Sequence, residues 1–344
     1  MDTVTPDLMR RAVLQGLGAS GLGALLSPRA TFAAATAPHR IDIHSHIAPP
    51  EWIRSLTPEG VILPPLANWT IARHLDDMDG AGVATAITSM TSPGLWFGDP
   101  AVARPLARAC NDYAAQLRAD YPGRFGVFVV LPLPDIDGSL KELEYGLDVL
   151  KADGVCLFTS YGDKWLGDPA FDPVFAELNR RKTVVYTHPI SANCCRNLVP
   201  GINDPSIEFG TDTTRAIARF VYSGSAARFP DVKLIFSHAG GTMPFLIERF
   251  DLLSRTPPYP QSLPAGFRSY ARNFYYDTAQ SSNAVALTAL KAVVPTSHIL
   301  FGTDYPFRTS LEHVEGLQKA GVFTAEEVRG IERDHALALL GRPR

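Results

Sequence analysis

From residue 40 onward, hydrophobic residues recur in short runs separated by longer amphipathic stretches. Eight of the runs are rich in β-branched and aromatic residues, which favour extended strands. They span residues 40–46, 84–89, 125–131, 154–160, 183–188, 233–238, 273–278 and 298–303. Strands that alternate with helices indicate a parallel sheet, and eight strands close a (β/α)8 barrel, the TIM barrel. The pattern therefore predicts an α/β protein with one barrel domain over residues 38–344.

The stretches between the runs have the spacing of amphipathic helices. Predicted helices span residues 100–121, 138–151, 169–181, 213–229, 284–293 and 324–340. Longer loops are expected at residues 49–68 and 191–211, after the first and fifth strands. Loops that follow the strands build the active site of this fold, so we expect both loops to shape substrate access.

Five side chains that bind metals in other proteins lie at the ends of these runs. His44 and His46 end the first run, His188 the fifth and His238 the sixth, and Asp304 directly follows the eighth. Residues two apart on a strand share a face, so His44 and His46 can reach one ion together. Imidazoles and a carboxylate suit zinc and its first-row neighbours. A lone buried histidine is more often a core residue, but four histidines and one aspartate at the ends of these runs indicate a metal site at the mouth of the barrel.

Composition favours a small-molecule substrate. The 344 residues carry a formal net charge of -3, and 46% of them are hydrophobic. Because there is no tract rich in Lys and Arg, the charge gives no reason to propose a nucleic-acid partner. The four cysteines lack the CxxC spacing of a thiolate zinc site. We expect the adjacent Cys194 and Cys195 to line or pack near the pocket.

The first 37 residues resemble a twin-arginine export signal. Arg10 and Arg11 precede a mildly apolar, uncharged stretch at 12–28 and a small-residue tract at 33–37. The apolar stretch is too short and too rich in glycine for a stable membrane span. We expect an exported, periplasmic protein with cleavage after Ala35. The alternative is a disordered extension on a cytoplasmic protein.

Aromatic residues follow two of the predicted strands. Trp96 and Phe97 lie after the second strand, and Tyr161 and Trp165 lie after the fourth. Aromatic residues in such loops serve in packing about as often as in recognition. We predict that these four side chains wall an aromatic substrate pocket.

Several segments between residues 40 and 340 resemble the amidohydrolase-2 branch of the metal-dependent amidohydrolase superfamily. They are IDIHSHI, the His188-Pro189 pair, SHAGGTMPFLIER, NFYYDTA and FGTDYPF. That branch contains 2-amino-3-carboxymuconate-6-semialdehyde decarboxylases and nonoxidative decarboxylases of aromatic acids. The segments LEYGLDVLKADGVCLFTSYGDKWLGDPAF and ELNRRKTVVYTHP are most similar to the 6-methylsalicylate decarboxylase subgroup.

This resemblance implies roles for individual residues. His44, His46, His188 and Asp304 match the ligands of one divalent ion, Zn²⁺ or alternatively Mn²⁺, and His238 matches the histidine that activates water at the metal. No lysine ends the fourth run, so the bridging lysine of two-metal relatives has no counterpart.

The resemblance also implies a homodimer with a cation shared across its interface. Arg249 matches an arginine that binds the substrate carboxylate across a dimer interface. A surface ion pair is the alternative for Arg249. The second carboxylate-binding arginine of the semialdehyde enzymes has no match ahead of Trp69, which favours a monocarboxylate.

These observations favour a metal-dependent decarboxylase of a small aromatic acid. Loss of CO2 leaves negative charge on a ring carbon, so the reaction needs a nearby cation and a proton donor, for which His238 and Asp304 are the candidates. The same metal site can also hydrolyse an amide or a lactone, and a fold alone does not decide between them. A catalytically silent metal-binding protein is the third alternative. Asp277, at the end of the seventh run, is expected to orient a ligand.

Overall fold

The computed structural model describes residues 39–57 and 62–343, all within the unit Ala37–Arg344. Its main sheet has eight parallel strands, in the order β1-β2-β3-β4-β7-β8-β9-β10. They are β1 (Arg40–His46), β2 (Val83–Ser89), β3 (Phe125–Val130), β4 (Gly154–Phe158), β7 (Val184–His188), β8 (Lys233–Phe236), β9 (Tyr275–Asp277) and β10 (Ile299–Leu300). The ring closes where the Ile43 N–H donates to the Phe301 carbonyl at 2.9 Å and Ser45 bridges Tyr305. The predicted TIM barrel is confirmed, and the export signal predicted for residues 1–37 lies outside the described residues.

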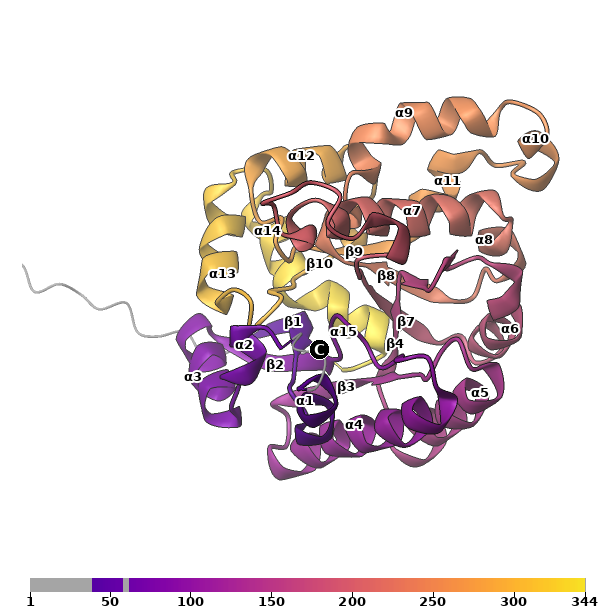
Figure 1. Ribbon diagram of the computed structural model, residues 1–344. Helices are drawn as coiled ribbons and strands as arrows, with labels where there is room; N and C mark the ends of the chain where they lie inside the picture. Colours follow the sequence, from indigo (N-terminus) through magenta and orange to yellow (C-terminus); the bar gives the residue numbers. More distant parts are fainter. Residues whose placement is uncertain (1–38, 58–61, 344) are drawn as a thin grey trace, which may run out of the picture. The chain divides into compact units, whose positions relative to one another are not determined.

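One principal helix follows each strand and packs outside the ring (Figure 1). These helices are α3 (Ile71–Ala81), α4 (Pro100–Asp120), α5 (Ile136–Glu144), α6 (Asp172–Arg180), α7 (Glu208–Tyr222), α9 (Met243–Ser254), α12 (Ala284–Lys291) and α13 (Ser310–Lys319). Shorter helices are α1 (Pro50–Leu56), α2 (Pro64–Ala67), α8 (Ser225–Arg228), α10 (Tyr259–Ser262), α11 (Phe267–Ala271), α14 (Ala325–Arg329) and α15 (His335–Leu340). A hairpin of β5 (Ser160–Tyr161) and β6 (Lys164–Trp165) follows β4.

Several predicted elements differ from the structure in their bounds. The loop expected at residues 49–68 contains the helices α1 and α2, and the single helix expected at residues 324–340 is divided into α14, a π-helical turn and α15. The helix expected from residue 213 begins at Glu208, so part of the predicted loop is helical. The strand expected to reach residue 238 ends at Phe236, and His238 starts the short 3₁₀ helix η5 (His238–Gly240). His238 and Ala239 both have a φ of 54°, in the left-handed region, so the chain leaves the strand direction there.

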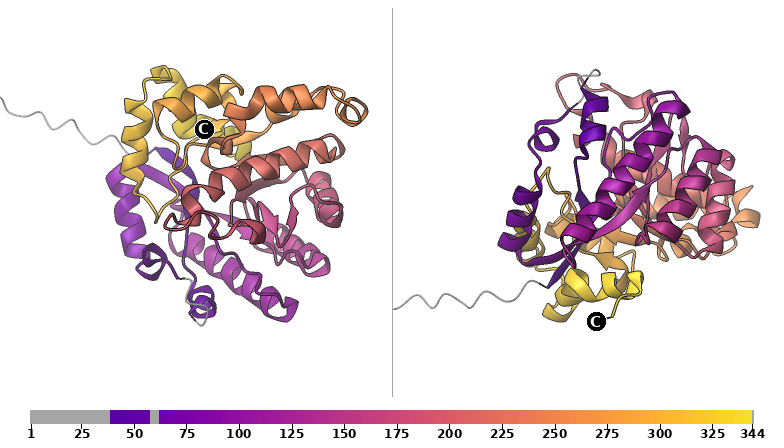
Figure 2. Two further views of the ribbon diagram at one scale, coloured as in Figure 1. Left: turned by 45° about the horizontal axis from the view of Figure 1, so that its top comes forward. Right: turned by 90° about the horizontal axis from the view of Figure 1, so that it is seen from below.

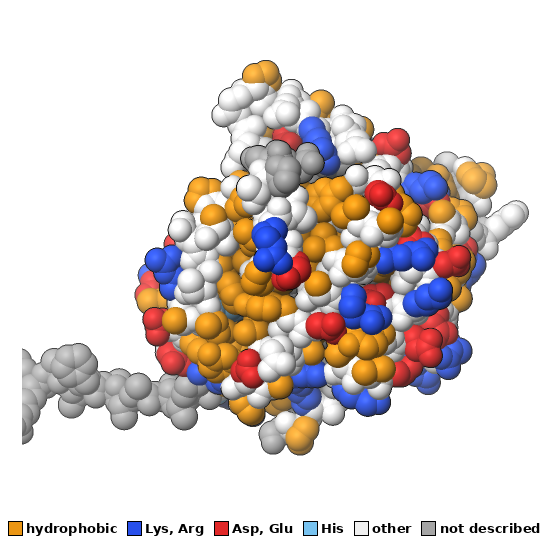
Figure 3. All heavy atoms as spheres, turned by 60° about the horizontal axis from the view of Figure 1, so that its bottom comes forward, with side chains coloured by type: hydrophobic (Ala, Val, Ile, Leu, Met, Phe, Trp, Pro, Cys, Tyr) orange, Lys and Arg blue, Asp and Glu red, His pale blue; other side chains and the backbone are white. Residues whose placement is uncertain are grey.

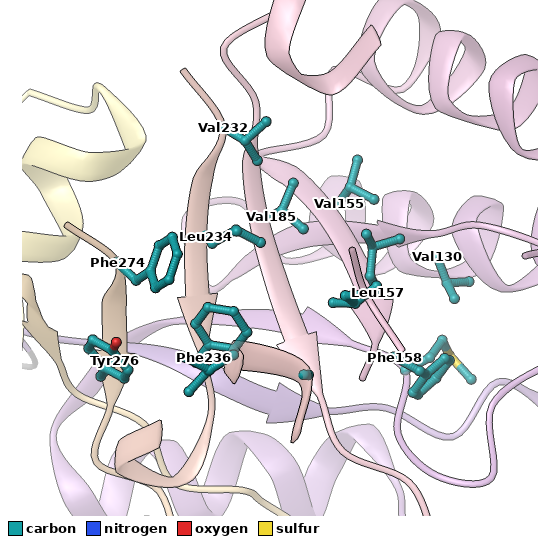
Figure 4. Packing of buried hydrophobic residues seen from close by; sticks show 14 of the residues in the cluster. Val130, Val155, Leu157, Phe158, Val185, Val232, Leu234, Phe236, Phe274 and Tyr276 are labelled. Carbon is teal, nitrogen blue, oxygen red and sulfur yellow. The ribbon is translucent and has the colours of Figure 1, made fainter. Parts of the chain in front are cut away.

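Apolar side chains on alternate strand positions face the helices and the interior of the barrel. Figure 4 shows Leu234 and Phe236 of β8 among the residues that pack between strands and helices. Ile235, between them in sequence, belongs to a second cluster with Tyr186 and with Leu337 of α15. This alternation is the period-two pattern of a strand that is buried on both faces.

The chain's last helices cover the end of the barrel where the strands begin. The Phe301 N–H donates to the Ile331 carbonyl, and Arg40, at the start of β1, pairs with Glu332 at 2.9 Å. The right view of Figure 2 shows these C-terminal helices at one end of the barrel. The opposite end, formed by the loops that follow the strands, is left for the functional site.

Ion pairs between neighbouring helices lie on the outside of the barrel. Arg104 and Arg108 of α4 pair with Asp135 and with Glu142 of α5, at 2.5 and 2.9 Å. Figure 3, which brings the bottom of Figure 1 forward, shows basic and acidic side chains next to one another on this side. The two arginine side chains are 48% and 43% exposed, and ion pairs in contact with water contribute little stability, so apolar packing holds the helices. Among the described residues, no helix combines the length and the apolar character needed to cross a membrane.

His74 makes the stability of the fold sensitive to acid. The side chain is buried between Ser45, whose Oγ lies 2.9 Å from Nε2, and Trp69, whose Nε1 donates to Nδ1 at 3.3 Å. Burial lowers the pKa of His74 from 6.5 to about 3. Below pH 6.5 the unfolded chain therefore binds a proton that the folded chain does not, and stability falls as the pH falls.

We expect His74→Gln to remove part of this acid sensitivity. Between pH 6.5 and pH 5 the wild type should lose about 2 kcal/mol of unfolding free energy through this residue, and the variant should not. Urea unfolding of both proteins at the two pH values measures the difference. An equal loss in the variant and in the wild type would contradict this prediction.

Candidate metal centre and active site

His44, His46, His188 and Asp304 come together at the mouth of the barrel and are all buried. One ligand atom from each lies within 4.8 Å of the other three. Asp304 Oδ1 is 3.2 Å from Nε2 of His44 and 3.1 Å from Nε2 of His46. A cluster of this size can surround one ion whose ligands sit at about 2.0–2.2 Å. The structure therefore contains a three-histidine, one-aspartate site that suits a divalent metal.

Hydrogen bonds at Nδ1 of each imidazole orient its Nε2 toward the site. The Nδ1 atoms of His46 and His188 lie 3.3 Å from the Ser89 carbonyl and 2.8 Å from the Pro189 carbonyl. Nδ1 of His44 lies 2.8 Å from Asp277 Oδ2. A carbonyl or carboxylate accepts only from a protonated Nδ1, which leaves each Nε2 free to bind a metal.

The electrostatics of the cluster match this ligand set. Burial lowers the pKa of both His46 and His188, so their rings are neutral. Burial also acts to lower the pKa of His44, but the charges of Asp277 and Asp304 outweigh it and raise that pKa to about 10. For Asp304, burial acts to raise the pKa, but the facing histidines, His44 first, hold it well below the usual range. Two carboxylates beside His44 favour a cation at this place, and a metal ion competes with the proton for Nε2.

Asp277 supports the cluster from behind, as the sequence predicts for a residue that orients a ligand. Its Oδ2 atom contacts His44, while Oδ1 accepts the backbone N–H groups of His238 at 2.9 Å and Ala279 at 3.0 Å. One carboxylate therefore fixes a metal ligand and the backbone of η5 together.

We expect Asp277→Asn to weaken metal binding about 10–100-fold, because partners of this type tune ligand basicity and orientation. Competition against a chromophoric chelator measures the affinity. Asp231→Asn, an exposed aspartate before β8, is the matched control and should bind as the wild type does. Equal affinity in Asp277→Asn and the wild type would contradict the prediction.

His238 stands beside the four ligands rather than among them. Its Nε2 lies 3.3 Å from Asp304 Oδ2, the carboxylate oxygen that also accepts from Gln280 Nε2 at 2.8 Å. His238, Ala239, Gln280 and Asp304 are all non-glycine residues with positive φ, between 54° and 63°. Left-handed backbone costs energy outside glycine and is concentrated at functional sites. Gln280 carries no sequence signal that would have identified it.

A pocket of about 570 Å³ opens beside the cluster, and we call it the metal pocket. Its lining residues are Leu63, Thr91, Ser92, Ser191, Asn203, Pro205, Ser206, Phe209, Gly210, His238, Gly241, Thr242, Gln280, Ser281, Asp304 and Phe307. The Phe209 ring lies 5.8 Å from His188 and 6.5 Å from His238, and the Phe307 ring lies 6.1 Å from His46. Among the described residues, His238 and Asp304 are the only titratable side chains in this lining.

The residues predicted to bind substrate lie outside the metal pocket. Trp96 and Tyr161 line a second cavity of about 320 Å³, which we call the side cavity. Its lining residues are Pro93, Gly94, Leu95, Trp96, Gly98, Leu131, Leu133, Phe158, Ser160, Tyr161, Gly162, Ile190, Ser191, Ala192, Asn193 and Arg196. Phe97 packs against the hydrophobic core and lines neither space, and Arg249 is exposed on α9. The metal pocket instead uses Phe209 and Phe307, which the sequence analysis missed.

Cys194 and Cys195 lie beside the side cavity and form a disulfide. The expectation of simple packing is therefore corrected. Spacing alone did not predict it, because adjacent cysteines rarely bond.

A (β/α)8 barrel with three imidazoles and a carboxylate at its mouth defines the class of metal-dependent barrel enzymes. The sequence profile of the amidohydrolase family matches residues 41–342, and the chain belongs to this family. The resemblance found in the sequence is confirmed.

Comparisons of sequence and structure with known proteins support this assignment. The chain is 39% identical over 282 residues to 6-methylsalicylic acid decarboxylase of Penicillium expansum, covering 78% of this chain and 85% of the relative. A crystal structure of 2,6-dihydroxybenzoate decarboxylase complexed with 2,6-dihydroxybenzoate superposes with a TM-score of 0.80 at 23% identity, over 88% and 99% of the two chains. A dihydroxybenzoic acid decarboxylase from Polaromonas sp., with bound manganese and the inhibitor 2-nitroresorcinol, has a TM-score of 0.76 at 23% identity, over 88% and 97%. At these identities the two structures support the fold.

Proposed function

We propose that this protein is a metal-dependent nonoxidative decarboxylase of a small aromatic monocarboxylic acid of the hydroxybenzoate or 6-methylsalicylate type. The observation that carries the proposal is the lining of the metal pocket, where Phe209 and Phe307 lie with two titratable side chains, His238 and Asp304, the only ones among the described residues. Decarboxylation adds one proton to a ring carbon, and a positioned acid next to a cation can deliver it. The decarboxylase relative supports the same chemistry.

The proposed reaction replaces the carboxylate of the substrate by a proton. When bound to His44, His46, His188 and Asp304, a divalent ion supplies positive charge beside the carboxylate and an ortho oxygen. We assign proton delivery to the His238–Asp304 pair, whose Nε2 and Oδ2 atoms are 3.3 Å apart. The ring carbon takes this proton, the carbon–carbon bond to the carboxylate breaks, and its electron pair returns to the ring as CO2 leaves. Phe209 and Phe307 hold the ring and exclude water.

The test is CO2 release from 6-methylsalicylate and a panel of hydroxybenzoates by metal-analysed protein, with His238→Asn as the blank. CO2 matched by the decarboxylated phenol is the expected result. No release from protein that holds about one metal per chain would contradict the proposal, and amide and lactone substrates would then test hydrolysis.

We propose Zn²⁺ as the ion, since neutral imidazoles with one carboxylate are a common zinc set. Manganese is the competing ion, and it is bound in the Polaromonas structure. Metal analysis of protein purified without added metal distinguishes them. Manganese in place of zinc would overturn this assignment.

We propose that the protein acts as a homodimer in which Arg249 reaches the metal pocket of the partner. Phe245, Arg249 and Leu252 lie at i, i+4 and i+7 on α9 and share one face, on which Phe245 is 86% and Leu252 69% exposed. Among the described residues, no Lys or Arg lines the metal pocket. An exposed apolar face with a cation at its centre therefore complements a pocket that must hold a carboxylate.

Mixing two variants of low activity tests this arrangement. In a mixed dimer of His238→Asn and Arg249→Ala, one site has an intact His238 and receives Arg249 from the other chain. We expect each variant alone to be weakly active and the mixture to regain activity. Mixed dimers that form in sedimentation experiments but stay inactive would contradict the shared site.

We also propose that the first 37 residues direct export to the periplasm by the twin-arginine route. A reporter fused to residues 1–40, with and without Arg10→Lys and Arg11→Lys, tests this. Secretion that is unchanged by the two substitutions would overturn it, and a cytoplasmic protein would be the remaining alternative.

A further inference from the structure

The side cavity has no part in the proposed reaction, although it has the size and walls of a ligand site. Its volume of about 320 Å³ falls in the range of small-molecule pockets. Trp96, Phe158 and Tyr161 supply aromatic walls. The Tyr161 hydroxyl accepts the Phe158 N–H at 2.9 Å, which leaves the tyrosine ring as the apolar surface. A flat, apolar group fits such walls by ring packing.

Arg196 is the only charged side chain in the lining of the side cavity among the described residues. Its Nε donates to the Ser191 carbonyl at 3.3 Å. Within the described part of the chain, no carboxylate lies within ion-pair distance of its guanidinium, whereas Arg104, Arg108 and Arg228 on the outer helices each pair with a carboxylate. A guanidinium is suited to bind a carboxylate through two parallel N–H bonds. The side cavity therefore pairs an apolar interior with one site for an anion.

We propose that the side cavity is a second binding site, for a small aromatic monocarboxylate whose ring lies against Trp96, Phe158 and Tyr161 and whose carboxylate binds Arg196. The site goes beyond the proposed function, because it uses none of the metal ligands and requires no turnover. It nevertheless adjoins the reaction centre. Ser191 lines both spaces, and the Phe158 ring lies 6.5 Å from the ring of His188.

Equilibrium dialysis of the full-length, metal-loaded protein against carbon-14 benzoate tests the proposal. Benzoate has the ring and the carboxylate but lacks the ortho hydroxyl of the proposed substrates. The variants are Arg196→Gln, which removes the anion site, and Trp96→Ala, which removes a wall. Arg272→Gln, an exposed arginine distant in sequence from the lining residues, is the matched control.

The expected result is that one bound benzoate per chain is lost, or bound at least about tenfold more weakly, in both variants, while the control binds as the wild type does. Benzoate in the metal pocket should remain. Unchanged binding in either variant, or an equal loss in the control, would overturn the proposal. Arg196 is exposed and Trp96 half-buried, and circular dichroism with metal analysis confirms that each variant is folded.

This test is independent of the proposed reaction. Failure of CO2 release leaves benzoate binding at Arg196 intact, and absence of that binding leaves the decarboxylase proposal intact.

Discussion

Replacement of His238 by asparagine is expected to lower decarboxylation about 10²–10⁴-fold, the usual contribution of a positioned proton donor. His238 lines the metal pocket and contacts Asp304 Oδ2, but it is not among the four ligand residues. Metal content should therefore stay near one ion per chain. Asparagine keeps a polar side chain of similar size, so the loss reports the missing imidazole. Initial rates of CO2 release, together with metal analysis of the same samples, measure both quantities.

The control for this variant is His298→Asn. His298 lies just before β10, at the end of the barrel away from the site, and its Nδ1 bonds the Phe274 carbonyl at 3.1 Å. Its activity should stay near that of the wild type. Full activity of His238→Asn would rule out its role in proton transfer, and loss of the metal would show that His238 acts as a ligand.

Removal of the metal is expected to abolish turnover and to destabilise the folded chain. Without the ion, no cation of the same chain faces the substrate carboxylate, because no Lys or Arg among the described residues lines the metal pocket, and the partner's Arg249 proposed above is left to act alone. A ligand that binds only the folded state stabilises it by about 4 kcal/mol when present at 1,000 times its Kd, so the melting temperature should fall on chelation. Activity assays and thermal unfolding before and after dialysis against a chelator measure the two effects.

Readdition of one equivalent of Zn²⁺ or Mn²⁺ provides the control, and the ion that restores more activity identifies the preferred metal. His46→Asn, which removes one ligand, should behave like chelated protein and should not recover. Undiminished activity in protein shown to be free of metal would contradict the proposed chemistry.

The barrel and its ligand cluster were predictable because both depend on strong local patterns. Runs such as those of β3 and β4 are continuously apolar, as is typical of strands buried on both faces. His44, His188 and Asp304 lie at the ends of such runs, and the fold brings those ends to one place. The sequence therefore predicted the site without any knowledge of the loops.

The pocket walls were not predictable in this way, because they depend on tertiary contacts of loops and on buried polar groups. The start of α7 buries Glu208, Asp212 and Thr213, so the hydrophobic period that marks a helix is absent there. Phe209 lies in this segment and was assigned to a loop. Trp96 and Tyr161 follow the expected strands, but their loops fold over the side cavity instead of the metal pocket.

The left-handed residues at the barrel mouth bear on how this protein could be engineered. Glycine at Ala239 or Gln280 would relieve backbone strain of about 1 kcal/mol at each position. Glycine at Ala239 would loosen the backbone that positions His238. Glycine at Gln280 would remove the hydrogen bond from Gln280 to Asp304. Stabilising substitutions at strained sites commonly reduce function. A search for heat-resistant variants would therefore select substitutions at positions that activity tolerates least. Such a search should measure both residual folded protein after heating and turnover.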